Sequence, residues 1–341
     1  MVAVIKPDVP GSCGPTPDAR NMSGWVTTRE WGMRRLVTHI AVQAAAIGLA
    51  MVAAAPAVAA GSHTDQSSSG SAVTGNDISY PQCGGAFPAR PAFGIVGVNG
   101  GLANDLNPCL GPSSSHPSYR QTELYWAVAA STGATSQPKA SLYVNTADPG
   151  NIYNGLPIAD LPTSGATPYG ACTTTTVTTP KGTFTVGKNS PACAWQYGYN
   201  KAAQDVSWIT SAANAIDAQK PPVTVAATAG SYPWWLDVEI QNTWQAGTSG
   251  HAMNVADLQG MIAALKQAGA SAIGAYSTSY QWTTITGGTT SSSGSLYQIP
   301  NWVPGAKTLS GAKSNCHLAS FTAGRNVITQ WFANPDGDYA C

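Results

Sequence analysis

The sequence that decides the fold is Trp234-Trp235-Leu236-Asp237-Val238-Glu239-Ile240, an apolar, strand-forming run that contains two acidic residues. Side chains two residues apart on a strand point to the same side, so Asp237 and Glu239 are expected to share one face. Burying two carboxylates costs free energy unless partners or a chemical task keep them there. Paired carboxylates suit glycoside hydrolysis, in which one acts as general acid while the other stays ionised. The alternative is a salt bridge or an exposed edge at a strand end.

The beginning of the chain has the pattern of an export signal. The basic start Met33-Arg34-Arg35 leads into an apolar run at 40–55 and a small-residue ending, Pro56-Ala57-Val58-Ala59-Ala60, with cleavage expected near Ala59 or Ala60. A membrane anchor is the alternative. We predict a secreted protein, extracellular or associated with the cell wall, with no stable membrane insertion after signal cleavage. The predicted segments are a non-structural extension (1–32), the signal peptide (33–60), a flexible leader rich in Ser and Gly (61–75) and one folded domain (76–341).

The composition of the folded domain argues against a nucleic-acid partner. From residue 76 onward there are eight Lys and three Arg against ten Asp and two Glu. Binding to nucleic acid normally requires a basic patch, which this balance does not supply. We therefore expect no nucleic-acid partner and a monomeric protein.

The cysteines of the folded domain predict disulfides. Six remain after the extension is removed, and an even set in a secreted chain is typical of a disulfide framework. Six cysteines allow fifteen pairings. Their order along the chain favours Cys83 with Cys109, Cys172 with Cys193, and Cys316 with Cys341. No spacing typical of zinc ligands occurs, so no metal and no cofactor are expected.

Strand-like and helix-like segments alternate along the domain, which is typical of a parallel sheet with crossover helices. We predict an α/β fold, an irregular (β/α)8 TIM-type barrel in a single domain. Helices are expected at 119–130, 200–219 and 254–268, the last with Asn254 as its cap. The predicted strands are 77–80, 93–98, 140–145, 234–240, 272–277, 301–303, 318–321 and 327–331.

A long segment rich in Pro, Gly and Thr follows the third predicted strand, at 146–193. It contains a hairpin pattern, 173–179 and 183–186, whose base Cys172 and Cys193 would clamp. We interpret it as a disulfide-clamped insertion that forms one wall of the active-site face. A surface hairpin without a role in the site is the alternative.

In this order the chain resembles the glycoside hydrolase family 25 lysozymes, which are cell-wall muramidases with an irregular barrel. The resemblance covers most of 76–341 and rests on four ordered motifs. These are Asp77-Ile78-Ser79-Tyr80-Pro81-Gln82, Leu236-Asp237-Val238-Glu239, Gly274-Ala275-Tyr276-Ser277 with Trp282 beyond, and Gln330-Trp331 followed by Asp338. Where that family's second strand commonly ends in Thr-Glu-Gly, this chain has Val98-Asn99-Gly100-Gly101.

The resemblance implies that Glu239 is the general acid and that Asp237 stabilises the developing positive charge or orients the acetamido group of the sugar. It also implies that Asp77 and Asp338 complete an acidic cleft. Neighbouring acids would raise the pKa of Glu239, as a general acid near neutral pH requires. A loop-capping role for Asp77 and a competing role for Asp336 remain open.

Aromatic side chains are expected to supply the sugar-binding surface, because flat rings pack against the C–H faces of pyranoses. The residues predicted to bind substrate are Tyr80, Asn99, Trp235, Tyr276, Trp282, Trp302 and Trp331, of which some are expected to be plain core. Asn99 is included because the backbone at Asn99-Gly100 can approach a ligand closely.

The sequence therefore predicts a secreted glycosidase, lysozyme-like, whose partner is a cell-wall glycan. Two alternatives stay open. One is a chitinase-like hydrolase, although Tyr232, Pro233 and Trp234 stand where that family has further aspartates. The other is a cell-wall-binding barrel that has kept the cleft without turnover.

Overall fold

The computed structural model describes residues 73–100, 105–151, 161–179 and 182–341. The predicted extension and signal peptide, and the leader up to residue 72, lie outside the described residues. The first strand begins at Thr74, so regular structure starts two residues before the expected domain boundary.

Eight strands close into a barrel, in the order β1-β14-β13-β12-β11-β10-β5-β2. Their bounds are Thr74–Ile78 (β1), Gly94–Gly97 (β2), Ala140–Asn145 (β5), Trp234–Asp237 (β10), Ile273–Tyr276 (β11), Asn301–Ala306 (β12), Asn326–Trp331 (β13) and Gly337–Ala340 (β14). The first seven pair in parallel along the barrel wall. The last strand, β14, runs antiparallel to both of its neighbours, β13 and β1. The closed barrel agrees with the prediction of eight strands, but the structure is a mixed barrel.

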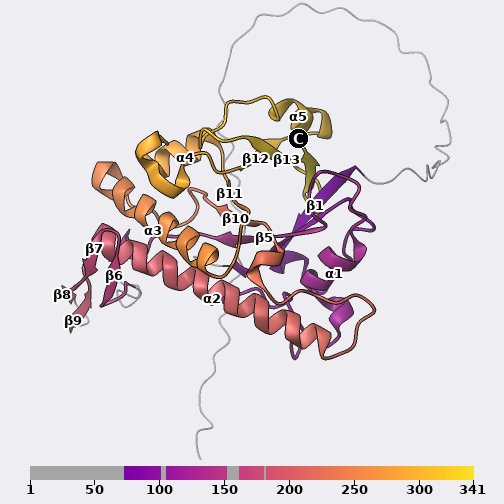
Figure 1. The fold of residues 1–341 in the computed structure, drawn as a ribbon, viewed down its shortest axis with the longest axis horizontal. Coiled ribbons are helices and arrows are strands. Elements are labelled where there is room, and N and C mark those ends of the chain that lie inside the picture. The colour runs from indigo at the N-terminus through magenta and orange to yellow at the C-terminus, as the bar shows by residue number, and fades with distance from the viewer. Residues whose placement is uncertain (1–72, 101–104, 152–160, 180–181) are drawn as a thin grey trace, which may run out of the picture. The chain divides into compact units, whose positions relative to one another are not determined.

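The helices cover the barrel unevenly. Helices α2 (Pro191–Asp217) and α3 (Gly247–Gln267) are the longest in the described part of the chain and lie along each other (Figure 1). Their backbones approach so closely that a Cβ on Gly198 would collide with the backbone of Asp257, and one on Gly260 with that of Trp195. Three shorter helices are α1 (Glu123–Ala130), α4 (Ser279–Thr286) and α5 (Leu309–Asn315). Single 3₁₀ turns occur at Tyr80–Gln82, Tyr119–Gln121, Pro149–Asn151 and Ala229–Ser231, with a longer one at Ser291–Leu296.

Strand alternation separates two apolar cores. On β10, Trp234 and Leu236 face outward into the layer between barrel and helices, whereas Trp235 faces the barrel interior. The interior cluster consists of Ala92, Phe93, Ile95, Trp235, Trp302 and Ile328. Asp237 has the same parity as Trp235, so it lies on the inward face at the end of the strand. The barrel is thus filled with aromatic and β-branched side chains below the level of the acids.

One predicted strand is wrong. Residues 318–321 form no strand, and β14 supplies the eighth strand of the barrel instead. The backbone of this segment is held by a side chain, because the Asn301 Oδ1 accepts from the Phe321 N at 3.1 Å. Another side chain, Asn326, donates to the Leu318 O at 2.7 Å, so side chains take the place of a strand partner at both ends of this segment.

The predicted start of α3 is also wrong. The helix begins at Gly247, and Asn254 lies buried inside it. The Asn254 Nδ2 donates to the Gln245 O at 2.9 Å and to the Ile285 O at 2.8 Å. The residue therefore ties α3 to the end of α4 and does not cap a helix.

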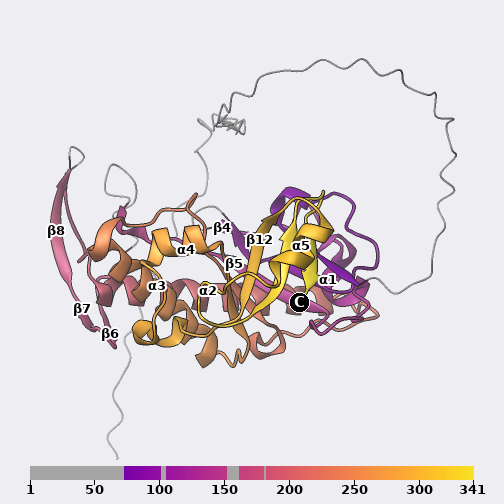
Figure 2. The same cartoon turned by 90° about the horizontal axis from the view of Figure 1, so that it is seen from above.

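Between β5 and α2, the described residues form two antiparallel pairs. These are β6 (Gly165–Thr167) with β7 (Gly170–Cys172), and β8 (Thr174–Thr179) with β9 (Gly182–Gly187). They lie beside the first turns of α2, at the end of that helix away from α1 (Figures 1 and 2). The predicted hairpin is present, while its interpretation as an insertion in a barrel stays a prediction.

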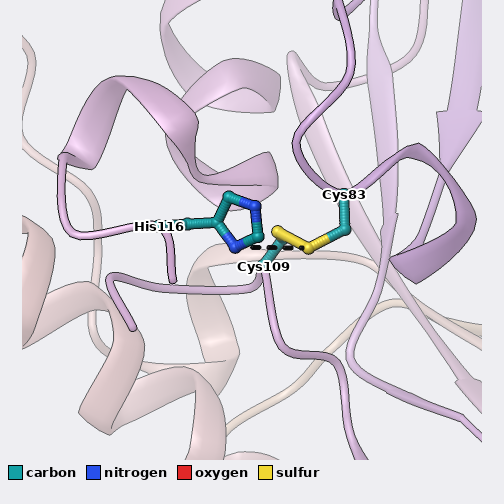
Figure 3. A group of neighbouring side chains, drawn as sticks. All are labelled: Cys83, Cys109 and His116. Carbon is teal, nitrogen blue, oxygen red and sulfur yellow. Dashed lines mark hydrogen bonds between the residues drawn. A yellow bond between two sulfur atoms is a disulfide. The ribbon is translucent and has the colours of Figure 1, made fainter. Parts of the chain in front are cut away.

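All three predicted disulfides are present: Cys83–Cys109, Cys172–Cys193 and Cys316–Cys341. The ring of His116 lies beside the first of them, with its Nδ1 3.7 Å from the Cys83 Sγ (Figure 3). This is the one group of potential metal ligands found among the described residues, and its two sulfurs are already bonded to each other.

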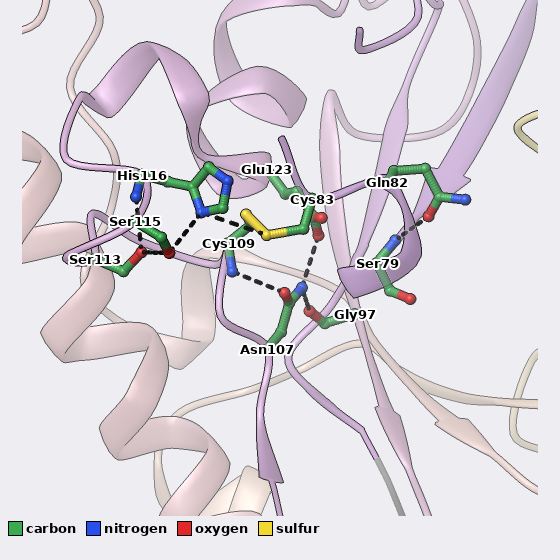
Figure 4. Close-up of a disulfide and its surroundings, with 10 residues drawn as sticks. All are labelled: Ser79, Gln82, Cys83, Gly97, Asn107, Cys109, Ser113, Ser115, His116 and Glu123. Atoms are coloured by element: carbon green, nitrogen blue, oxygen red, sulfur yellow. Dashed lines mark hydrogen bonds between the residues drawn. A yellow bond between two sulfur atoms is a disulfide. The ribbon is translucent and has the colours of Figure 1, made fainter. Parts of the chain in front are cut away.

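A further pair of short strands, β3 (Asn99–Gly100) and β4 (Asp105–Leu106), follows β2. Just beyond it, the Asn107 side chain contacts the Cys109 N, the Gly97 O and the carboxyl group of Glu123 (Figure 4). Within the described ranges, no helix is both long and apolar enough to span a bilayer.

Candidate active site

The predicted acids come together at the end of the barrel where the parallel strands finish. Asp77 is the fourth residue of β1 and Asp237 the last residue of β10, while Glu239 stands two residues beyond β10. Asp338 joins them from β14, because its antiparallel direction places the beginning of that strand beside the end of β13. The carboxyl ends of parallel barrel strands are the usual place for catalytic groups.

Asp77 and Asp338 form a pair of interacting carboxyl groups. Burial raises the pKa of Asp77 to about 6, and burial together with the charge of Asp77 raises the pKa of Asp338 well above its ordinary value. The outer oxygens of the pair also have donors. The Gln330 Nε2 donates to the Asp77 Oδ2 at 2.9 Å, and the Trp302 Nε1 donates to the Asp338 Oδ1 at 2.8 Å. Two such carboxyl groups in contact hold one proton between them in the pH range where isolated carboxylates are ionised.

A tyrosine extends this network across the barrel mouth. The Tyr276 Oη donates to the Gln330 Oε1 at 2.9 Å, so the amide orientation of Gln330 is fixed from both sides. The Tyr276 ring packs edge-on against Trp302, with ring centroids 4.5 Å apart. Burial, followed by the charges of the nearby acids, raises the pKa of Tyr276 well above its ordinary value, so the hydroxyl stays a donor.

Asp237 and Glu239 form a second pair of acids, in which Asp237 lies deeper. Its side chain is 7% exposed, and its Oδ1 has no hydrogen-bond partner among the described residues. Burial, then the charges of Glu239 and Asp77, raise its pKa well above the ordinary value. Its backbone is fixed, because the Asp237 O accepts from the Thr146 Oγ1 at 2.6 Å. The geometry thus leaves an unpaired carboxyl oxygen in a largely buried position.

Glu239 is half-buried and lies nearer to solvent than Asp237. Burial raises its pKa, and a hydrogen bond from the Gln281 side chain lowers it in part. Gln281 is held in place because its Oε1 accepts from the Ile240 N at 2.9 Å. The Trp244 Nε1 donates to the Glu239 O at 2.9 Å and steadies the turn. Glu239 therefore combines access to a ligand with a raised proton affinity.

Two residues of the site were not identified from the sequence. Gln281 lies on α4, where one glutamine in a helix gives no signal of its function. Tyr143 lies in β5, and its pKa is raised mainly by burial and then by the charge of Asp77. A hydrogen bond with the Ser79 side chain lowers this pKa in part, whereas the charge of Asp237 raises it further. The alternation of β5 could have indicated that Tyr143 points inward.

The residues predicted to bind substrate occupy different environments. Trp235 and Trp302 are buried in the barrel interior, and Trp331 is half-buried against Gly337. Trp282 is 1% exposed in the outer core, where its Nε1 donates to the Thr289 Oγ1 at 2.6 Å. Tyr80, by contrast, is 51% exposed.

Asn99 is buried, and its side chain is hydrogen-bonded to the backbone of Asn145. The Asn145 N donates to the Asn99 Oδ1 at 2.6 Å, and the Asn99 Nδ2 donates to the Asn145 O at 3.2 Å. Asn99 therefore joins the beginning of β3 to the end of β5.

The two aspartates near the end of the chain lie in different environments. Asp338 is fully buried in the acid pair, whereas Asp336 is half-buried in the preceding turn and its Oδ1 accepts from the Ala333 N at 3.3 Å. Asp77 lies within a strand and contacts Gln330, which is not the geometry of a loop cap.

Comparison with known proteins gives little beyond this geometry. No protein-family model matches the chain, and no curated protein matches it. Among solved structures, the chain is similar to a muramidase from Trichobolus zukalii, with 14% identity and a TM-score of 0.37, over 79% of this chain and 94% of that one. A similarity at that level supports no inference about activity.

Proposed function

We propose that the protein is a glycoside hydrolase that cleaves bacterial cell-wall polysaccharide in the manner of a muramidase. The observation that carries the proposal is the pairing of half-buried Glu239 with buried Asp237 at the barrel mouth, next to the Asp77–Asp338 carboxyl pair. Two carboxyl groups in different environments, of which the accessible one has a raised pKa, suit acid-assisted cleavage of a glycosidic bond.

Glu239 is the general acid in this proposal. It is the member of the pair that a substrate can reach, and its raised pKa keeps the proton available closer to neutral pH. Gln281 contacts its carboxyl group and is itself held by the Ile240 N. Asp237 lies deeper and has an unpaired oxygen, which suits it to orient an acetamido group; in its ionised form it would stabilise the positive charge of an oxocarbenium-like transition state.

The Asp77–Asp338 pair shapes the electrostatics of the same cleft. Because the pair retains a proton, it presents less negative charge to Asp237 than two free carboxylates would. Together with Tyr276 and Gln330 it forms a rigid polar wall for hydroxyl and amide groups of a sugar.

The proposed location is the cell exterior. The three disulfides suit an oxidising compartment. The predicted signal peptide would bring the domain there.

The test is release of reducing ends from purified peptidoglycan by the protein beginning at residue 61, compared with its Glu239→Gln variant. Asp105→Asn, which changes an exposed carboxyl group on β4, is the matched control. We expect release by the parent and the control and a loss of at least about a hundredfold in the variant. Equal release by parent and Glu239→Gln, or binding to the glycan with no release by either, would refute the proposal; the second result would identify a carbohydrate-binding barrel.

A further inference from the structure

Exposed apolar side chains gather at the same end of the barrel as the acids. Five of the large hydrophobic residues exposed in the described part of the chain follow the carboxyl ends of parallel strands or lie in the loops there. They are Tyr80 after β1, Leu106 in the β3–β4 pair after β2, Ile240 after β10, Tyr280 in α4 after β11, and Phe332 after β13. Exposed apolar side chains that lie close to one another can mark a ligand-binding groove, and these five lie around the acids.

One group stands next to Glu239. Tyr280 is 71% exposed and precedes Gln281, the residue that bonds to the Glu239 side chain. Ile240 is 45% exposed, and its backbone N donates to that same Gln281. Tyr280 is therefore adjacent in sequence to the residue that contacts the general acid, and its side chain is largely exposed.

The other group stands next to the Asp77–Asp338 pair. Phe332 is 63% exposed and lies two residues after Gln330, which donates to Asp77. Its backbone is fixed by donation from the Phe332 N to the Ala306 O at 3.0 Å. Tyr80 lies three residues after Asp77 on the adjoining strand end.

The barrel order places these two groups on different sides of the mouth. Strands β13, β14 and β1 are consecutive neighbours and carry the second group, whereas β10 and β11 carry the first. The two sets are separated by β12 in one direction and by β5 and β2 in the other. A linear ligand that crosses the acids from one set to the other would meet both rings.

We propose that Tyr280 and Phe332 are sugar-binding platforms on opposite sides of the cleaved bond, with Tyr280 on the leaving-group side. This assignment rests on the proposed function, because a general acid protonates the leaving-group oxygen and so marks the side of the sugar that departs. Flat rings pack against the C–H faces of pyranoses, and each ring favours occupation of its own side. The substrate is accordingly a polysaccharide bound over several sugars and cut internally.

The experiment uses glycan strands of one defined length, freed from stem peptides and labelled at the reducing end, and measures the lengths of labelled products. Tyr280→Ala removes the preference for sugars on the reducing side, so labelled products become shorter. Phe332→Ala makes them longer. Each change should alter the ratio of neighbouring products by about two- to tenfold. Tyr280→Phe and Phe332→Tyr keep the rings and should keep the parent pattern.

Leu318→Ala is the control, since Leu318 is 53% exposed near the beginning of β13, at the opposite end of the barrel. It should leave both rate and pattern unchanged. Unchanged product lengths in both alanine variants, or a shift in the same direction, would overturn the assignment while leaving the proposed function intact. Strands left uncut by the parent would overturn the proposed function and the assignment together.

Discussion

Glu123 gives the prediction with the clearest magnitude. It is fully buried in the first turn of α1, and its Oε2 accepts from the Asn107 Nδ2 at 2.7 Å (Figure 4). Burial raises its pKa from the ordinary 4.5 to about 7. At about 1.4 kcal/mol per pH unit, this difference corresponds to about 3 kcal/mol of unfolding free energy. The folded state holds the proton more tightly than the unfolded state, so this contribution is complete below about pH 4.5 and is lost as the pH rises to about 7.

Glu123→Gln keeps an acceptor for Asn107 and cannot ionise. We therefore expect the variant to gain about 3 kcal/mol relative to the parent between about pH 4 and pH 8, whatever its offset at low pH. Urea unfolding followed by tryptophan fluorescence, with disulfides intact and at several pH values, measures the difference. Asp105→Asn, which changes an exposed side chain, is the control: its difference in unfolding free energy from the parent should stay the same at every pH. A constant offset between Glu123→Gln and the parent across this range would show that Glu123 does not resist ionisation in the folded state.

Three further outcomes follow from other contacts. Gln281→Ala removes the hydrogen bond that lowers the pKa of Glu239, so the basic limb of the kcat/KM profile should move to higher pH as the rate falls; an unmoved limb would contradict this role. Replacing Cys172 and Cys193 by Ser opens a loop with a separation of 21 residues, which should cost about 3 kcal/mol in urea unfolding; an unchanged midpoint would mean that the link adds no stability. Gly198→Ala forces a methyl group against the α3 backbone and should lower stability by about 1–3 kcal/mol, and an unchanged Tm would show that the two helices can separate without cost.

The fold was predictable where local sequence and packing agree. The strand at 140–145 matches β5 at both ends, because a short run with Leu142, Tyr143 and Val144 at its centre is bounded by polar residues. The closing strand β14 was not predicted because Gly337 and Asp338 are poor strand formers. They adopt a strand only through pairing with β1 and β13. Asn254 was misread for a similar reason, since its buried bonds depend on α4, which lies far along the sequence.

The acidic residues of the site could be predicted from the sequence, but the residues that contact and position them could not. Asp237 and Glu239 stand out because charged residues are rare in apolar runs. Gln281 acquires its role only when α4 packs over the turn after β10. Exposure is equally invisible in sequence: Trp282 and Tyr280 are two residues apart on one helix, yet one is buried in the outer core and the other faces solvent.

The antiparallel closing strand also bears on the order in which the molecule assembles. Gln330 meets Asp77 across 253 residues, and the Asn76 side chain donates to the Asp336 backbone across 260. Contacts between such distant residues form late, because the chain entropy lost in joining them is large. During refolding we therefore expect the tryptophan-rich strands to regain their environment first. The carboxyl pair, and with it hydrolytic capacity, should appear only when the final strand docks, so an incompletely folded chain would carry no assembled acid site.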